Sequence, residues 1–274
     1  MSGSSSPDGH LGIGGATPAP LTVVLVIVLA HRGLPAADRP ENTLDAVRAA
    51  LAAGADGVEV DVRLTADGIL AVSHDADLAR LTGSATPVAT TPWDELRTAA
   101  GAAGLALALA EDLLVVAAGA RVVLEAKQPP PHPAASARTA LALAGMLRSL
   151  QRQAVPLDVT VSSFSPRLVE HVRRLLPPSS GVRTALLGDA FDRPSALIRQ
   201  ALAAGHDEVH PHVLALLADP GAVEVAHAVG VAVVPWTVNA RREVRRCARL
   251  GVDAVITDVP AVVRAVTGGR TAVA

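Results

Sequence analysis

The stretch GVEVDVRLTADGILAVSHD occupies residues 57–75 and contains two apolar runs separated by an Asp-Gly pair. Apolar runs joined by Asp-Gly commonly form a hairpin, so we expect a strand at Gly57–Val62 and a returning arm at Ile69–His74. The first arm carries Glu59 and Asp61 between valines. Because side chains two residues apart share one face of a strand, this arm is predicted to have a carboxylate face and a valine face.

Short β-branched runs alternate with alanine- and leucine-rich segments along the rest of the chain. Besides Gly57–Val62, the strand candidates are Val24–His31, Arg121–Lys127, Val159–Phe164, Val182–Leu187, Glu208–His212, Val231–Val238 and Asp253–Thr257. The helix candidates include Asn42–Ala53, Ala135–Arg152, Pro166–Leu176, Pro194–Ala204, Ala222–Val229 and Arg241–Leu250. Eight βα units in about 250 residues predict an α/β fold, the (β/α)₈ TIM barrel, with a β-hairpin extension after strand 2. A doubly wound sheet is the alternative, but it binds its ligand at one switch point.

Polar residues fall at the ends of the predicted strands, where (β/α)₈ barrels place their active sites. They are His31, Asp61, Glu125, Lys127, Ser163, His210, His212, Trp236 and, just after the last strand, Asp258. Because nearly every strand contributes, this distribution favours a ring-shaped site over a single crevice. For the pair His210 and His212 we expect a substrate-rim or structural role rather than a second metal site.

Glu59, Asp61 and Glu125 are predicted to converge on this rim as a hard-oxygen metal site. Two carboxylates about 5 Å apart repel by roughly 3 kcal/mol at an effective dielectric near 20, so they need a cation or a shared proton. Three carboxylates suit Ca²⁺ or Mg²⁺ better than zinc, since no His/Cys pair lies nearby at metal-binding spacing. A solvent-facing strand side is the alternative for the acidic pair, but the intervening valines favour the barrel interior.

His31 and His74 reach the predicted rim from different directions, and a pair of imidazoles suits acid-base chemistry near neutral pH. Taken singly, each would more often be an ordinary core or surface histidine. Arg32 and Lys127 add positive charge that could neutralise a phosphate. Lys127 is the only lysine of the chain, which fits a need for a compact point charge; a salt bridge with Glu125 is compatible with that role.

The composition limits the kinds of partner, membrane attachment and cross-link that the chain can have. The chain has 274 residues, half of them hydrophobic, with 24 basic and 26 acidic side chains, so we expect neither a nucleic-acid partner nor an anionic-membrane surface. The apolar run at residues 21–30 is too short to span a bilayer, which excludes stable membrane insertion by it. We expect a disordered leader at residues 1–20 followed by one barrel domain at residues 21–274. The single cysteine, Cys247, excludes an internal disulfide and is compatible with a cytoplasmic location.

Several motifs occur together in one order: AHRG, PENT, GADGVEVDVRLTADG, HDADLARLTG, LEAK, SSF, WTVN and GVDAVITDVP. Over about residues 29–260 the chain resembles the glycerophosphodiester phosphodiesterase family. The resemblance implies a (β/α)₈ barrel that uses Ca²⁺ or Mg²⁺ to hydrolyse glycerophosphodiesters to sn-glycerol 3-phosphate and an alcohol, in lipid and glycerol metabolism. The expected partner is thus a small-molecule substrate.

The resemblance also implies a role for each matching residue. His31 and His74 would be the acid-base pair, and Glu59, Asp61 and Glu125 the metal ligands, with Glu41 of PENT supporting or joining them. Arg32 and Lys127 would hold the phosphate, and Trp236 would line the substrate pocket. Water and the glycerol 2-hydroxyl both stay open as the nucleophile, and either histidine could be the acid.

The chain departs from the family in its aromatic content. The segment Leu78–Ala110, where the family commonly carries a capping insertion, is rich in alanine and contributes Trp93 as its only aromatic residue. There is no tyrosine, so the usual aromatic contacts to the substrate are largely missing and the head-group preference stays open, as does the oligomeric state. The alternatives are a related barrel phosphodiesterase acting on lysophospholipids or phosphoinositides, and a catalytically silent barrel that binds a phosphodiester.

Overall fold

The computed structural model describes residues 26–127 and 134–268. Its strands are β1 (Ile27–His31), β2 (Gly57–Leu64), β3 (Leu70–Val72), β4 (Arg121–Ala126), β5 (Asp158–Ser163), β6 (Arg183–Gly188), β7 (Glu208–Pro211), β8 (Ala232–Val233) and β9 (Ala254–Thr257). All except β3 pair in parallel in the order β8-β7-β6-β5-β4-β2-β1-β9. Backbone hydrogen bonds from Asp253 N to Val233 O and from Ile256 N to Pro235 O, 3.1 and 3.0 Å long, join the two ends. The predicted eight-stranded barrel is confirmed.

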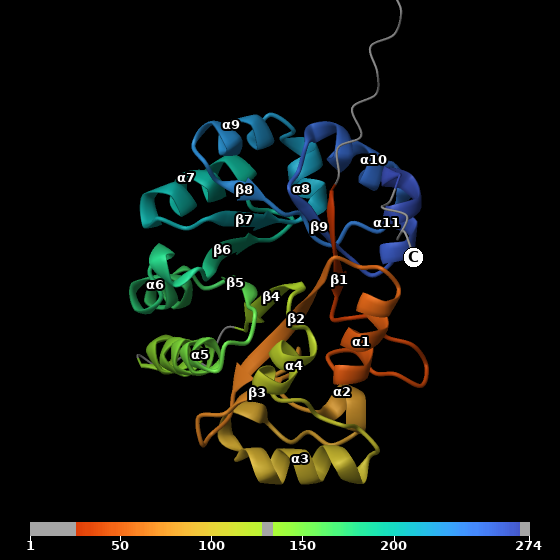
Figure 1. Cartoon of the computed structure of the whole chain (residues 1–274), viewed down its shortest axis with the longest axis vertical. Coiled ribbons are helices and arrows are strands. Elements are labelled where there is room, and N and C mark those ends of the chain that lie inside the picture. Colours follow the sequence, from red (N-terminus) through yellow and green to blue (C-terminus); the bar gives the residue numbers. More distant parts are fainter. Residues whose placement is uncertain (1–25, 128–133, 269–274) are drawn as a thin grey trace, which may run out of the picture.

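Helices surround this ring of strands (Figure 1). They are α1 (Leu44–Ala52), α2 (Ala79–Thr82), α3 (Trp93–Ala102), α4 (Ala110–Val116), α5 (Ala135–Arg152), α6 (Pro166–Leu175), α7 (Pro194–Ala204), α8 (Val213–Ala218), α9 (Ala222–Ala228), α10 (Arg241–Leu250) and α11 (Pro260–Thr267), with short 3₁₀ turns at η1 (Val88–Thr90) and η2 (Pro178–Ser180). Helix α1 begins later than the predicted Asn42, because the Thr43 hydroxyl accepts a hydrogen bond from Ala46 N and caps the helix.

Successive side chains along each strand point alternately toward the outer helices and into the barrel interior. This alternation explains how a strand can bury acidic residues. Val58, Val60 and Val62 of β2 belong to the large hydrophobic core between the strands and the helices. Inside the barrel, a smaller cluster includes Leu29, Val123, Val234, Ala254 and Ile256. Glu59 and Asp61 are therefore on the interior face of β2, as the alternation predicted.

The hairpin predicted after strand 2 is present. β3 pairs antiparallel with the end of β2, with Val62 opposite Val72. The following segment forms α2, η1 and α3, which lie together at one end of the molecule beside β3 (Figure 1). Their own small core contains Ala71, Leu78, Val88, Leu96, Ala100 and Leu105, with Trp93 packed against it. The segment Leu78–Ala110 thus contains a packed unit, and Trp93 packs against its core.

Strand β8 is shorter than the sequence indicates. We expected Val231–Val238, whereas the regular strand covers only Ala232–Val233. Pro235 interrupts it because proline has no N–H to continue the ladder. The chain nevertheless stays beside its neighbour, since Trp236 N donates to Pro211 O over 3.1 Å. The end of this segment therefore still delivers Trp236 to the C-terminal end of the barrel.

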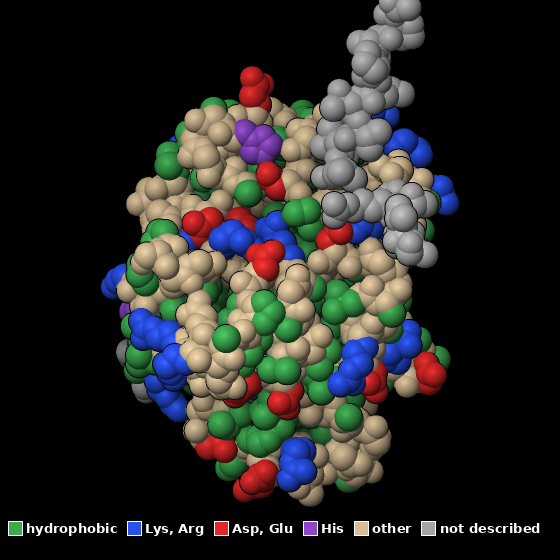
Figure 2. Space-filling model, in the orientation of Figure 1, with side chains coloured by type: hydrophobic (Ala, Val, Ile, Leu, Met, Phe, Trp, Pro, Cys, Tyr) green, Lys and Arg blue, Asp and Glu red, His purple; other side chains and the backbone are tan. Residues whose placement is uncertain are grey.

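Charges of both signs are mixed on the surface. On the face shown in Figure 2, Lys and Arg side chains lie beside Asp and Glu side chains in a band across the middle. Among the described residues, no helix combines the length and the apolar character needed to cross a membrane. The predicted leader at residues 1–20 lies outside the described residues.

Candidate active site

A cavity of about 290 Å³ opens at the C-terminal ends of the strands. Its lining comes from seven of the eight barrel strands or the residues that directly follow them, from the segment after β8 and from the loop after β3. These are His31, Arg32, Glu59, His74, Glu125, Lys127, Ser162, Phe164, Leu187, His210, Trp236, Thr237 and Ile256. Most of the predicted site residues therefore meet at one cavity.

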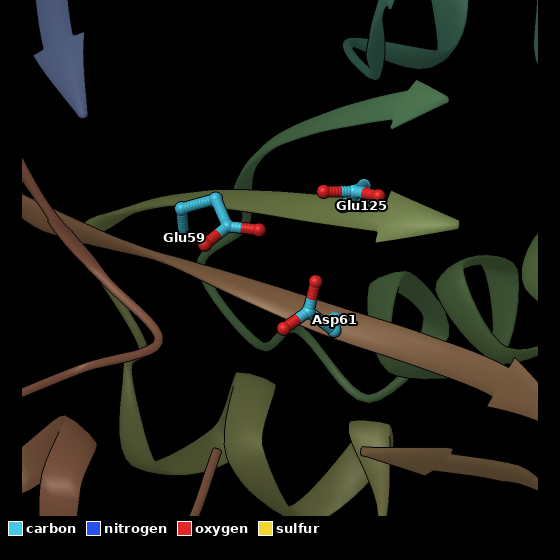
Figure 3. A group of neighbouring side chains, drawn as sticks. All are labelled: Glu59, Asp61 and Glu125. Atoms are coloured by element: carbon cyan, nitrogen blue, oxygen red, sulfur yellow. The ribbon is translucent and has the colours of Figure 1, made fainter. Parts of the chain in front are cut away.

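Three carboxylates form the most acidic part of this site. Glu59 and Asp61 come from β2 and Glu125 from β4, and Figure 3 shows their carboxyl groups turned toward the space between them. One oxygen from each lies within 4.8 Å of the others, and all three side chains are buried. Parallel pairing places Asp61 directly opposite Glu125, which explains why segments 64 residues apart in sequence supply neighbouring carboxylates.

The backbone near β1 is shaped to hold these carboxylates. Arg32 has a φ of +57°, and its N–H donates to the Glu59 backbone carbonyl over 2.7 Å and to Glu59 Oε2 over 3.2 Å. Asn42, also with a positive φ of +60°, donates through Nδ2 to Asp61 Oδ2 over 2.8 Å. Its Oδ1 accepts from the Asp61 N–H over 3.1 Å. Both acids are thereby fixed in position by residues that follow β1.

Two basic side chains neutralise part of the negative charge. Lys127 Nζ lies 2.7 Å from Asp61 Oδ1 and 2.5 Å from Glu125 Oε1, and Arg32 Nε lies 3.3 Å from Asp61 Oδ2. The salt bridge between Lys127 and Glu125 that the sequence allowed is therefore present. Lys127 and Arg32 also line the cavity, so the same positive charges face a ligand.

The negative charge that these two basic side chains do not neutralise affects Glu59 most. Burial, together with the charges of Asp61 and Glu125, raises the pKa of Glu59 well above its ordinary value, which Lys127 and Arg32 only partly offset. For Asp61, burial alone would raise the pKa, but the charges of Lys127 and Arg32 hold it below its usual value. Among the described residues, Glu59 Oε1 has no hydrogen-bond partner. An uncompensated buried carboxylate with a free oxygen fits a divalent cation held by these three acids.

His31 is oriented by an aspartate at the end of β9. Its Nδ1 lies 2.6 Å from Asp258 Oδ1, and Nε2 lies 3.9 Å from Glu59 Oε2. Asn239 Nδ2 donates to the other Asp258 oxygen over 2.6 Å. The hydrogen bond from His31 holds the pKa of Asp258 below its usual range. An ionised carboxylate accepts only, so Nδ1 carries the hydrogen and Nε2 is left facing the acidic cluster.

His74, which follows the returning strand β3, has a similar arrangement. Its Nδ1 lies 2.7 Å from Asp75 Oδ1, and Arg80 Nε donates to Asp75 Oδ2 over 2.6 Å. Arg63 donates two hydrogen bonds to the His74 carbonyl, 3.0 and 2.8 Å long. These contacts fix both the backbone and the ring, so two histidines with aspartate-bound Nδ1 atoms line one cavity.

Glu41 lies outside the group of three carboxylates. Its Oε1 accepts hydrogen bonds from Arg32 Nη1 over 2.9 Å and from Arg80 Nη2 over 2.6 Å. Although burial alone would raise it, these arginines hold the pKa of Glu41 below its usual value. Glu41 therefore links Arg32 to the His74 side of the site through Arg80.

Trp236 forms part of the cavity wall, as expected. Its Nε1 donates to the carbonyls of His210 and Gly188 over 3.0 and 3.2 Å. Its ring makes edge contacts with Phe164 and His212, with centroids 5.6 and 5.2 Å apart. The indole is thereby held rigidly between β7 and the end of β5.

Some residues of the site were not anticipated from the sequence. Asn42, Asp75 and Asn239 lie in loops and Arg80 in the single-turn helix α2, where no periodic pattern shows which way a side chain points; all four hold the acids and histidines in place. The sequence also singled out Ser163, whose hydroxyl donates to the Ala126 carbonyl over 2.6 Å. It is Ser162, one residue earlier, that lines the cavity; the strand's alternation carries this information once its inward face is known.

A barrel with acids, two histidines, a lysine and an arginine around one cavity has the groups that suit a phosphoryl-transfer enzyme. Residues 31–262 match the glycerophosphoryl diester phosphodiesterase family. The chain belongs to this family of phosphodiesterases.

Relatives and solved structures agree with this assignment. The chain is 34% identical over 251 residues to a probable glycerophosphodiester phosphodiesterase 1 of Mycobacterium tuberculosis, covering 85% of this chain and 89% of the relative. It is 28% identical over 248 residues to a glycerophosphodiester phosphodiesterase of Bacillus altitudinis, covering 85% and 94%. A phosphodiesterase from Oleispira antarctica, solved in complex with the product sn-glycerol-3-phosphate, is similar with a TM-score of 0.73 and 25% identity, covering 88% and 96%.

Proposed function

We propose that this protein hydrolyses glycerophosphodiesters to sn-glycerol 3-phosphate and an alcohol, with a divalent metal held by Glu59, Asp61 and Glu125. The observation that carries the proposal is the arrangement of His31 and His74, each oriented by an aspartate and both lining the cavity that contains Glu59 and Glu125. The product complex of the Oleispira antarctica phosphodiesterase supports the same substrate class.

The three carboxylates are the metal ligands of this proposal, and Ca²⁺ or Mg²⁺ suits their oxygen atoms. When bound, such an ion supplies Lewis-acid stabilisation of the negative charge that develops on the phosphate. Its positive charge would relieve the repulsion that burdens Glu59. Glu41 supports the site indirectly, because it fixes the guanidinium of Arg32.

Arg32 and Lys127 bind the phosphate in this scheme. Each forms an ion pair with a buried acid, and each also lines the cavity. Lys127 presents a compact ammonium group between Asp61 and Glu125, so it can donate to a phosphate oxygen without leaving the acids. Trp236 provides an apolar wall against which the substrate carbon chain packs.

His31 and His74 move the protons. One histidine accepts the proton of the attacking hydroxyl through its Nε2 atom, and the other donates a proton to the leaving alkoxide. Asp258 and Asp75 stabilise the imidazolium that forms on each ring, because both bind the Nδ1 hydrogen. Without such proton transfer the alcohol would have to leave as a high-energy alkoxide.

The test is release of sn-glycerol 3-phosphate from a panel of glycerophosphodiesters, and of choline from lysophosphatidylcholine, in the presence and absence of a chelator. We expect His31→Ala and Glu59→Ala to lose at least 100-fold in kcat/KM, and the chelator to abolish turnover. His227→Ala is the matched control, since its ring pairs with Asp253 over 2.9 Å and does not line the cavity. Turnover unaffected by both substitutions and by the chelator would refute the site, and turnover of lysophosphatidylcholine alone would refute the substrate.

A further inference from the structure

The cavity wall carries two polar groups for which the proposed reaction has no use. Ser162 lies on β5 and His210 on β7, and both side chains are almost completely buried. Both line the cavity, yet within the described part of the chain neither Ser162 Oγ nor His210 Nδ1 has a hydrogen-bond partner. Buried polar groups are normally paired, so two such atoms facing one cavity indicate a ligand that pairs with them.

The positions of the two residues relative to the acids follow from the strand order and register. In the ring of eight parallel strands, three strands separate β7 from β2 in either direction. His210 therefore lies across the barrel from Glu59 and Asp61. Ser162 lies beside the acids instead, since it pairs in register with Glu125 of the neighbouring strand β4. A cavity of about 290 Å³ between His210 and the acids is of the size that a small polar molecule fills. One molecule can thus touch both sides at once.

The orientation of the His210 ring is set by Glu208, two residues earlier on the same face of β7. His210 Nε2 lies 3.0 Å from Glu208 Oε2. The other Glu208 oxygen accepts hydrogen bonds from Arg121, Arg183 and Thr160, at 2.7, 2.8 and 3.0 Å. Burial alone would raise the pKa of Glu208, but the hydrogen bond and charge of His210 and the two arginines lower it to about 2.

This arrangement fixes which atom of the His210 ring is available. An ionised carboxylate only accepts, so Nε2 must carry a hydrogen whether the ring is neutral or protonated. The atom left for the cavity is Nδ1, which accepts a hydrogen bond when the ring is neutral and donates one when it is protonated. A hydroxyl group satisfies either state because it both donates and accepts. The same is true of a hydroxyl facing Ser162 Oγ.

We propose that His210 Nδ1 and Ser162 Oγ form a subsite for a hydroxyl group of the glycerol moiety, so that the enzyme selects polyol esters over other phosphodiesters. The inference rests on the proposed function, since the phosphate is taken to lie at Lys127 and Arg32, across the cavity from His210. A substrate without that hydroxyl would leave two buried polar atoms unpaired, which makes its binding unfavourable. Specificity for glycerol would then come from two side chains that take no part in the bond cleavage.

The experiment compares glycerophosphocholine with two analogues, the phosphocholine esters of 1,2-propanediol and 1,3-propanediol, each of which lacks one glycerol hydroxyl. For the wild-type enzyme we expect kcat/KM to fall about 10-fold to 100-fold on at least one analogue. His210→Leu and Ser162→Ala should lose a similar factor on glycerophosphocholine and little on that analogue. The discrimination between the substrates should therefore shrink toward 1.

His206→Gln provides the matched control. This buried histidine bonds Thr184 through Nδ1 and does not line the cavity, so its substitution should leave the ratio of kcat/KM values unchanged. Should His210→Leu fail to fold, ¹⁵N-histidine spectra of the wild type give a second measurement. The His210 Nδ1 resonance is expected to shift on addition of sn-glycerol 3-phosphate, and His210→Gln identifies that resonance by its loss.

The inference is overturned if the wild type hydrolyses glycerophosphocholine and both analogues equally well. It is also overturned if His210→Leu and Ser162→Ala lower activity on all three substrates by the same factor, or if the Nδ1 resonance does not respond to sn-glycerol 3-phosphate. Failure of the proposed function looks different, because the wild type would then release no sn-glycerol 3-phosphate from any substrate of the panel.

Discussion

Glu59 on β2 and Glu208 on β7 point into the barrel from opposite sides of the ring, and both are almost completely buried. Glu208 is met by Arg121, Arg183 and His210, and its pKa is lowered to about 2. Glu59 has Asp61 and Glu125 beside it, and its pKa is raised well above the ordinary value. The same residue type thus stands in two opposite electrostatic environments within one barrel.

The difference separates a structural charge from a functional one. A buried acid whose partners neutralise it contributes to the folded state, and removing it leaves those partners unpaired. A buried acid with an unbalanced charge opposes folding and persists because it binds something. Four measurements test this comparison, in order of expected effect.

The largest effect is expected for Glu59→Gln. We expect kcat/KM to fall at least 1,000-fold, about 4 kcal/mol at 1.36 kcal/mol per factor of ten. The melting temperature should stay the same or rise, because the repulsion from Asp61 and Glu125 is relieved. Steady-state kinetics and thermal unfolding without added metal measure the two effects. Glu170→Gln, on the exposed face of α6, is the control; a large loss of stability in Glu59→Gln would break the comparison.

The opposite result is expected for Glu208→Leu, which leaves the charges of Arg121 and Arg183 without their shared acid. We expect a loss of about 3 kcal/mol in the free energy of unfolding, measured by denaturant titration. The pH dependence follows from the lowered pKa of Glu208. Its contribution is complete above the ordinary value of 4.5 and is lost as the pH falls toward about 2. An unfolding free energy in Glu208→Leu equal to that of the wild type would contradict this assignment.

Asp258→Asn is expected to have a smaller effect on rate. An amide can donate to Nδ1 of His31 instead of accepting from it, which favours the wrong ring tautomer. We expect kcat to fall about 100-fold, close to 2.7 kcal/mol, with KM and melting temperature nearly unchanged. Asp253→Asn disrupts the His227 pair outside the cavity and should leave kcat as it is. Equal kinetic losses in the two variants would show that the His31 pair has no special role.

Metal binding gives the smallest of these effects. At ten times the dissociation constant, a bound ion stabilises the folded protein by about 1.4 kcal/mol, so Ca²⁺ or Mg²⁺ should raise the melting temperature of the wild type. Glu59→Gln should show no such increase, whereas His227→Ala should respond like the wild type. If the melting temperature of Glu59→Gln responds as strongly as that of the wild type, the ion binds elsewhere.

The strands that carry the site could be predicted because alternation along a strand is a local signal. Valines next to Glu59 and Asp61 indicated a buried strand with an acidic inner face, and the parallel register then brings Glu125 opposite Asp61. The partners of those acids could not be predicted in the same way. Asn42 reaches Asp61 only because its backbone has a positive φ, and no periodic pattern indicates such a turn.

The group of basic side chains around Glu208 could not be predicted from the sequence either. Arg121 begins β4 and Arg183 begins β6, on either side of β5, and both side chains reach Glu208 on β7 inside the barrel. The contacts of Arg80 with Glu41 and Asp75 depend in the same way on how the unit formed by α2, η1 and α3 packs. Such long-range contacts follow from packing, which a single sequence does not display.

Because aromatic residues are scarce, intrinsic tryptophan fluorescence can report on the active site. The chain contains no tyrosine and two tryptophans. Trp93 packs in the unit beside β3, while Trp236 lies on the cavity wall between Phe164 and His212. A protein carrying Trp93→Phe retains a single indole, and all of its tryptophan fluorescence arises at the cavity. Ligand binding and product release can then be followed in real time by the fluorescence of Trp236 in the cavity, without any attached dye.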